Sequence, residues 1–122
     1  MKLTEVMSRD VVVIHPNATL EAAAARMELL NVGPLPVCDG YRLMGMLTDR
    51  DITVRATSMG RDPRTTRVQD VMTTSIVACR EDDDVSKAAS LMEEKQVRRL
   101  VVVNAKNHMV GMVSQSDLAS AS

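Results

Sequence analysis

The chain contains one sequence pattern twice, and this repeat constrains the fold more than any other feature. Val6-Met7-Ser8 recurs as Val71-Met72-Thr73, and after a one-residue insertion Gly45-Met46-Leu47-Thr48 recurs as Gly111-Met112-Val113-Ser114. A self-similar chain is built from structural units that stack on each other. One copy is too short to bury its apolar residues well by itself. We therefore expect two copies packed sheet to sheet in one module with pseudo-two-fold symmetry, with clefts where they meet.

The repeat also predicts how the chain is divided. We place the first repeat at residues 1–60, a linker at 61–70 and the second repeat at 71–122. Together these parts form a single module whose length is usual for one domain.

The first copy predicts the element order β-α-β-β-α. A β-branched run at 11–14 predicts a strand, and apolar residues at helical spacing from Leu20 predict a helix with Thr19 as its N-cap. We then expect strands at 35–38 and 43–47 around an Asp39-Gly40 turn, and a closing helix at about 49–59.

The second copy repeats this order, which makes the fold class α/β (α+β). Strands are expected at 76–78, 100–103 and 109–113, with a longer turn at 104–108. Asp84 is the expected N-cap of the first helix, and a short closing helix begins near Gln115.

Composition excludes several classes of protein. The 15 basic residues nearly balance the 16 acidic ones, and the chain has one Tyr and no Phe or Trp, so we expect no binding to nucleic acid. No apolar run approaches a membrane span and the start lacks a signal-peptide pattern, so we expect a soluble cytoplasmic protein. The ten methionines are expected in the core, and Cys38 and Cys79 are expected to be buried thiols, although a disulfide between them is possible.

The repeated motifs resemble those of a pair of CBS domains, also called a Bateman module. The resemblance covers nearly the whole chain, which looks like a stand-alone bacterial or archaeal pair. The motifs occur in the same order in both copies, at residues 5–7, 32–37 and 45–51 and again at 70–72, 96–103 and 111–117. The resemblance implies tandem CBS repeats, homodimerisation and binding of an adenosine compound.

Two interpretations fit Thr48-x-x-Asp51 and Ser114-x-x-Asp117, which both stand where a strand becomes a helix. The first is a capping box, in which the hydroxyl and the acidic side chain satisfy free backbone N–H groups. The second is a nucleotide site, in which the hydroxyl donates to phosphate at a helix N-terminus and the carboxylate accepts from the ribose hydroxyls. The resemblance favours the second interpretation.

The resemblance implies two ligand sites, each built from both copies. The preferred site is expected around Asp117, because Arg98 and Arg99 suit a polyphosphate. The residues implied for this site are Ser114, Ser116, Asp117, Arg98, Arg99, His15 and Gly33. Pro16, which follows His15 at the end of the first strand, is also implied as a ligand-binding residue. The residues implied for the other site are Thr48, Arg50, Asp51, Arg80, Gly33 and Pro34.

No catalytic arrangement or metal-binding motif appears in the sequence, so we expect neither enzyme activity nor a required cofactor or metal. The leading hypothesis is a regulatory module that binds AMP, ADP or ATP, forms a homodimer and acts on an unidentified protein. The alternatives are a structural or dimerisation module with degenerate pockets, and a module that binds S-adenosylmethionine or NAD. A metal-binding enzyme is the remote alternative.

Overall fold

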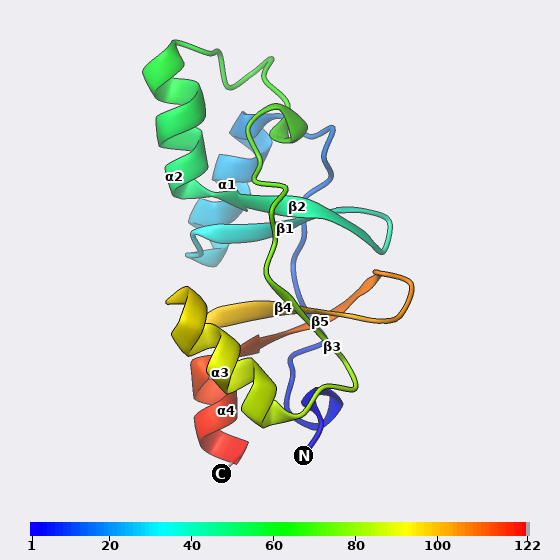
Figure 1. The fold of residues 1–122 in the computed structure, drawn as a ribbon. Helices are drawn as coiled ribbons and strands as arrows, with labels where there is room; N and C mark the ends of the chain where they lie inside the picture. The colour runs from blue at the N-terminus through cyan, green and yellow to red at the C-terminus, as the bar shows by residue number, and fades with distance from the viewer. Residues whose placement is uncertain (122) are drawn as a thin grey trace. The chain divides into compact units, whose positions relative to one another are not determined.

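A computed structural model describes residues 1–121 and shows a mixed α/β fold (Figure 1), which confirms the predicted fold class. The contacts divide the chain into two compact units. The first-repeat unit is Val12–Ile76. The second-repeat unit combines Met1–Val11 with the chain from Val77 onward.

The first-repeat unit places helices beside a hairpin. Helix α1 (Leu20–Leu30) precedes the antiparallel strands β1 (Pro34–Asp39) and β2 (Arg42–Thr48). The chain then enters α2 (Asp49–Asp51), and helical turns continue through η2 (Ile52–Ala56), a π-helical segment, and η3 (Thr57–Met59). A further short turn, η4, covers Val68–Asp70. The predicted hairpin and closing helix are confirmed.

The second-repeat unit has the same plan. A short turn, η1 (Leu3–Glu5), lies at the start of the chain. Strand β3 (Ala78–Arg80) runs parallel to β4 (Arg99–Val103), which pairs antiparallel with β5 (Met109–Ser114). The helices are α3 (Val85–Lys95) and α4 (Gln115–Ala121).

Both long helices begin at the predicted N-caps. The Thr19 hydroxyl accepts the N–H of Ala22 at 3.2 Å, and the Asp84 carboxylate accepts the N–H of Ser86 at 3.0 Å. Both helices end at a residue in the left-handed conformation, Asn31 with φ 53° and Gln96 with φ 56°. Such a residue stops helical propagation while its N–H still bonds to the last turn.

The strand predicted at 11–14 is present only as one parallel bridge, between Ile14 and Val37. Ile14 donates to the Pro36 carbonyl at 2.9 Å and accepts from Cys38 at 3.0 Å. The next bond toward the N-terminus would need an N–H from Pro36, and proline has none, so the ladder stops. In the second copy the strand predicted at 76–78 lies at Ala78–Arg80, and the first hairpin turn lies at Gly40 and Tyr41, one position later than predicted.

The two units do not coincide with the sequence repeats, because a short segment of each repeat belongs to the unit of the other repeat. Thr73 forms an antiparallel bridge with Met46 of β2, and Ser8 forms the matching bridge with Met112 of β5. The segment before each repeat's first strand thus completes the sheet of the other repeat. The boundaries at 1–60, 61–70 and 71–122 divide the sequence by similarity and stay a prediction, as do the clefts between the copies.

Each unit has its own aliphatic core. Met27 and Leu47 are buried in the first-repeat unit, and Met7, Met92 and Val113 are buried in the second-repeat unit. These three methionines pack as core residues, as predicted, whereas Met1 and Met59 are exposed, so the prediction is wrong for them.

The two cysteines are buried free thiols. Burial raises the pKa of the Cys38 thiol. Burial, with a smaller contribution from Asp83, raises the pKa of the Cys79 thiol. Both side chains therefore behave as small apolar residues at neutral pH.

Candidate functional site

The two Thr/Ser-x-x-Asp motifs form the same junction between a strand and a helix. Thr48 donates its N–H to Asp51 Oδ2 at 3.0 Å, and Asp51 donates its N–H back to Thr48 Oγ1 at 3.0 Å. The corresponding distances between Ser114 and Asp117 are 2.9 Å and 3.1 Å. Both junctions are therefore capping boxes, which confirms the capping geometry. Among the described residues the Thr48 hydroxyl oxygen only accepts, so its hydrogen remains able to donate to a further group. The Ser114 hydroxyl also hydrogen-bonds the Ser116 hydroxyl, and either of the two can be the donor.

The junction in the second-repeat unit gathers five of the predicted residues. Arg99 is the strand partner of Ser114, and the Arg98 carbonyl accepts the N–H of Gln115 at 2.8 Å. The hydroxyls of Ser114 and Ser116 lie 3.0 Å apart. Both arginines are exposed, while Asp117 is half-buried. A strip of hydroxyl groups thus lies next to two cationic side chains and one carboxylate.

The junction in the first-repeat unit brings Gly33 and Pro34 to the Thr48 end of β2. Pro34 is the strand partner of Thr48, and the Gly33 carbonyl accepts the N–H of Asp49 at 3.1 Å. A Cβ atom on Gly33 would lie 3.2 Å from Asp49 Oδ1, so this position favours glycine. Arg50 is exposed at the same junction.

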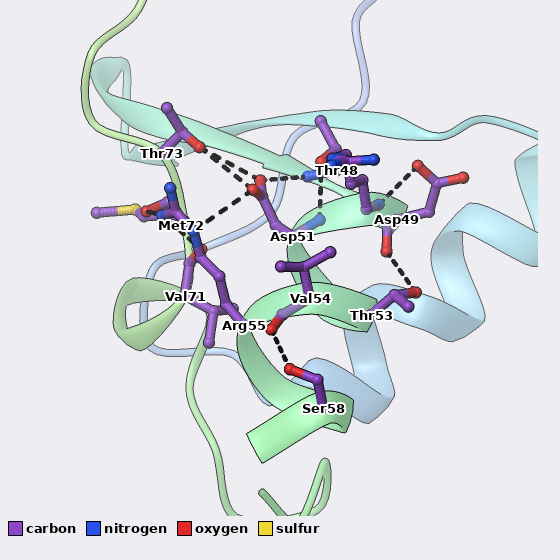
Figure 2. A network of polar contacts seen from close by, with 11 residues as sticks. Thr48, Asp49, Asp51, Thr53, Val54, Arg55, Ser58, Val71, Met72 and Thr73 are labelled. Carbon is purple, nitrogen blue, oxygen red and sulfur yellow. Dashed lines mark hydrogen bonds and ion pairs between the residues drawn. The ribbon is translucent and has the colours of Figure 1, made fainter. Parts of the chain in front are cut away.

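Figure 2 shows the partners of Asp51, which are more numerous than those of its counterpart Asp117. The Thr73 hydroxyl donates to Asp51 Oδ1 at 3.3 Å, and Arg55 Nε lies 4.0 Å from the same oxygen. Arg55 Nη1 also donates to the carbonyls of Val71 and Met72, at 3.4 Å and 3.1 Å. The Asp51 side chain is only 13% exposed. This carboxylate is therefore largely enclosed by its own unit.

The remaining predicted residues lie away from these junctions in their own units. His15 accepts the N–H of Asn17 through Nδ1 at 3.0 Å, and its Nε2 lies 3.5 Å from an Asp39 carboxylate oxygen. Pro16 is buried, and Arg80 is exposed at the end of β3.

The predicted sites combine residues of different units. His15, Pro16 and Gly33 belong to the first-repeat unit, whereas Asp117 belongs to the second. Likewise Arg80 and Asp51 belong to different units. These combinations stay predictions.

Sequence analysis did not identify Arg55 and Thr73 as residues near the Asp51 carboxylate. The spacing of Asp51 and Arg55 carried a signal, because side chains four residues apart on a helix are neighbours. The signal for Thr73 was weaker. Its alignment with Ser8 marks it as part of the repeat, but only the bridge to Met46 brings it to Asp51.

Two features are absent from residues 1–121. No helix in this part of the chain is both long enough and apolar enough to span a membrane. Nor does this part contain a cluster of three or more His, Cys, Asp or Glu side chains arranged to hold a metal ion.

The fold and the paired junctions define a class of small tandem-repeat α/β modules. A family model of the CBS domain matches residues 3–56 and 68–122, so the chain belongs to the CBS-domain family. It is 42% identical over 115 residues to CBS domain-containing protein YhcV of Bacillus subtilis, a match that covers 94% of this chain and 81% of YhcV. It is 36% identical over 116 residues to hypoxic response protein 1 of Mycobacterium tuberculosis, covering 94% and 80%.

Solved structures show the same fold. The crystal structure of hypoxic response protein I with two coordinated zinc ions matches with a TM-score of 0.89 and 34% identity, over 100% of this chain and 99% of that one. CBSX2 in complex with AMP matches with a TM-score of 0.84 at 24% identity, over 98% and 94%. The CBS-domain pair of MJ0100, in complex with 5′-methylthioadenosine and S-adenosylmethionine, matches with a TM-score of 0.79 at 23% identity, over 99% and 98%.

Proposed function

We propose that this protein is a non-catalytic regulatory module that binds AMP, ADP or ATP between its repeats. The observation that carries the proposal is the reciprocal Thr/Ser–Asp junction, present once in each unit of a CBS-domain protein. The complexes of CBSX2 with AMP and of MJ0100 with adenosine compounds support an adenosine ligand. Since adenosine nucleotides are abundant in the cytoplasm, the proposal also places the protein there.

The preferred site is the one at Asp117. Its Oδ2 accepts the Ser114 N–H, and among residues 1–121 no hydrogen bond reaches its Oδ1. A carboxylate with a free oxygen accepts the two hydroxyls of a ribose. The hydroxyls of Ser114 and Ser116 donate to phosphate, and the guanidinium groups of Arg98 and Arg99 supply the positive charge that phosphate needs.

The test is a calorimetric titration with AMP and ATP of the wild type, Asp117→Ala and Asp51→Ala. Hydrogen bonds to a charged group contribute about 1.5–3 kcal/mol each, so the loss of two of them in Asp117→Ala is expected to weaken binding by about 100-fold or more. Asp51→Ala is expected to weaken it less. Asp82→Ala is the matched control, because it removes an exposed carboxylate from the same unit. Absence of heat at millimolar ligand contradicts the function, and equal or reversed losses contradict the ranking of the sites.

The arginine pair distinguishes the ligand classes. If the ligand carries a polyphosphate, the double variant Arg98→Ala/Arg99→Ala loses more affinity for ATP than for S-adenosylmethionine, because only ATP presents several phosphate charges. Equal losses for the two ligands contradict a polyphosphate ligand and favour S-adenosylmethionine.

A dimerisation module is the second candidate function, and a groove in the second-repeat unit favours it. The groove has a volume of about 720 Å³ and lies between α3 and α4. Its lining combines apolar and polar residues, namely Ala89, Met92, Val97, Leu118 and Ala119 with Glu93, Gln96, Arg98 and Gln115. We propose that a second copy of the chain docks there, because Ala89 and Val97 expose apolar surface of the kind found at the core of an interface.

Sedimentation equilibrium tests the dimer. Ala89→Glu places a charge in the groove and is expected to shift the protein toward monomer, whereas Asp82→Ala is not. Dimerisation with no dependence on nucleotide, together with absence of nucleotide binding, supports the second candidate over the first. A monomeric wild type contradicts the dimer.

A further inference from the structure

Residues of its own unit contact both oxygens of the Asp51 carboxylate. Oδ2 accepts the N–H of Thr48, Oδ1 accepts the hydroxyl of Thr73, and the guanidinium of Arg55 lies beside Oδ1 (Figure 2). With 13% of the side chain exposed, little of this acceptor faces solvent. The Thr73 hydroxyl therefore occupies a position on the carboxylate that a hydroxyl of a ligand would also need.

Arg55 ties this carboxylate to the segment that precedes Thr73. Its Nε lies near Asp51, while its Nη1 donates to the carbonyls of Val71 and Met72. One cation thus holds both the acid and the backbone of the neighbouring segment. The planar guanidinium has the several donors that this double role requires.

The backbone of Thr73 is fixed independently of its side chain. Thr73 donates its N–H to the Met46 carbonyl at 2.8 Å and accepts the Met46 N–H at 2.9 Å. These two bonds hold the segment on β2 whether or not the hydroxyl contacts Asp51. The hydroxyl is therefore free to rotate away without release of the strand.

The second repeat lacks the corresponding contacts. The repeat places Ser8 at the position of Thr73 and Ala121 at the position of Arg55. Alanine brings no cation to Asp117, and within the described chain no hydrogen bond joins the Ser8 hydroxyl to Asp117. The enclosed carboxylate is thus a property of the first repeat alone.

We propose that Thr73 and Arg55 form a latch on Asp51, and that a ligand with a pair of adjacent hydroxyls reaches Asp51 only by displacing the Thr73 hydroxyl. The ligand step rests on the proposed function. Thr73 and Arg55 are positioning residues in this scheme, because they act through Asp51. The latch makes the first site weaker than the second and couples its occupation to the contacts of residues 71–73.

Thr73→Val tests the latch, because valine keeps the β-branched shape and the backbone bridge but has no hydroxyl. The titration with AMP is made in an Asp117→Ala background, so that the measured affinity is that of the first site. Removal of the competing hydroxyl is expected to tighten AMP binding by about 3- to 10-fold, the usual range for one net hydrogen bond. Thr74→Val, at the exposed neighbouring position, is the matched control and leaves the affinity unchanged.

A second readout needs no ligand. In ¹³C NMR spectra of the ligand-free protein, the Asp51 carboxyl resonance is expected to move in Thr73→Val and to stay in place in Thr74→Val. An unmoved resonance in Thr73→Val overturns the latch alone. Equal or weaker AMP binding by Thr73→Val overturns the displacement step, and absence of AMP binding in the wild type and every variant overturns both that step and the proposed function.

Discussion

At the scale of single residues, the side-chain atoms that cap a helix are the ones that bind the ligand in the proposed function. The Thr48 and Ser114 oxygens accept the N–H of the acidic residue three positions later. This leaves the Thr48 hydroxyl hydrogen available, and at the second junction one hydrogen of the Ser114–Ser116 hydroxyl pair. Helix capping and nucleotide binding are therefore compatible at these positions. What differs between the repeats is the set of neighbours of the carboxylate, namely Arg55 and Thr73 at Asp51.

The stabilisation of α3 by its N-cap, Asp84, depends on pH. Its carboxylate accepts the hydroxyl of Ser86 at 2.6 Å and the N–H of Ser86 at 3.0 Å, and it lies 3.1 Å from the terminal ammonium of Met1. The bonds from Ser86, followed by the ammonium group, hold the pKa of Asp84 well below its usual value. A lowered pKa in the folded state means that the charged form stabilises the fold.

We predict that Asp84→Asn, which keeps a capping oxygen but removes the charge, is less stable than the wild type at pH 7. The stabilisation by the charge is fully present above the unfolded pKa of about 4 and is lost as the pH falls through the lower folded value. The difference in free energy of unfolding is therefore expected to shrink below about pH 4. Urea titrations at several pH values measure it, with exposed Asp82→Asn as the control. A difference that stays constant with pH contradicts this account.

At the scale of elements, the close approach of backbone segments explains two of the repeated glycines. A Cβ atom on Gly45 would lie 2.8 Å from the Thr73 carbonyl oxygen, and one on Gly111 would lie 2.7 Å from the Ser8 carbonyl oxygen. Contacts this short with a backbone oxygen require the segment to move. Glycine at these positions therefore allows the exchanged segments to pair with β2 and β5.

Gly45→Ala is accordingly predicted to destabilise the protein by about 1–3 kcal/mol, the usual cost of overpacking. Circular dichroism in urea measures this loss. Gly33→Ala is the control, because its nearest contact, at 3.2 Å, is the movable side chain of Asp49, and a smaller loss is expected there. An unchanged midpoint for Gly45→Ala would show that the segment at Thr73 is not held against β2.

Local sequence signals predicted the helices and hairpins, because Thr19 and Asp84 are good caps and the apolar positions have clear periods. They did not predict the exchange of segments, since the pairing of Thr73 with Met46 joins residues far apart in the chain. Nor did they predict the interrupted strand at Ile14, which depends on a proline in its neighbour. The contact of Thr73 with Asp51 was missed for the same reason as the exchange.

At the scale of the whole molecule, the chain is a CBS-domain pair whose two units are built alike but differ around the acidic residue of each junction. An enclosed carboxylate in one unit and a more open one in the other predict two sites of unequal affinity. Such a pair would respond to a ligand over two concentration ranges. Regulation then requires that the ligand favour one state of the protein over another.

Equilibrium dialysis of the ligand-free protein against labelled AMP tests the central claim most directly. The wild type is expected to bind AMP saturably, with a tighter and a weaker class of site. The double variant Asp51→Ala/Asp117→Ala is expected to lose both, while Asp82→Ala keeps them. Absence of saturable binding to the wild type, or equal binding by the double variant, would contradict the account.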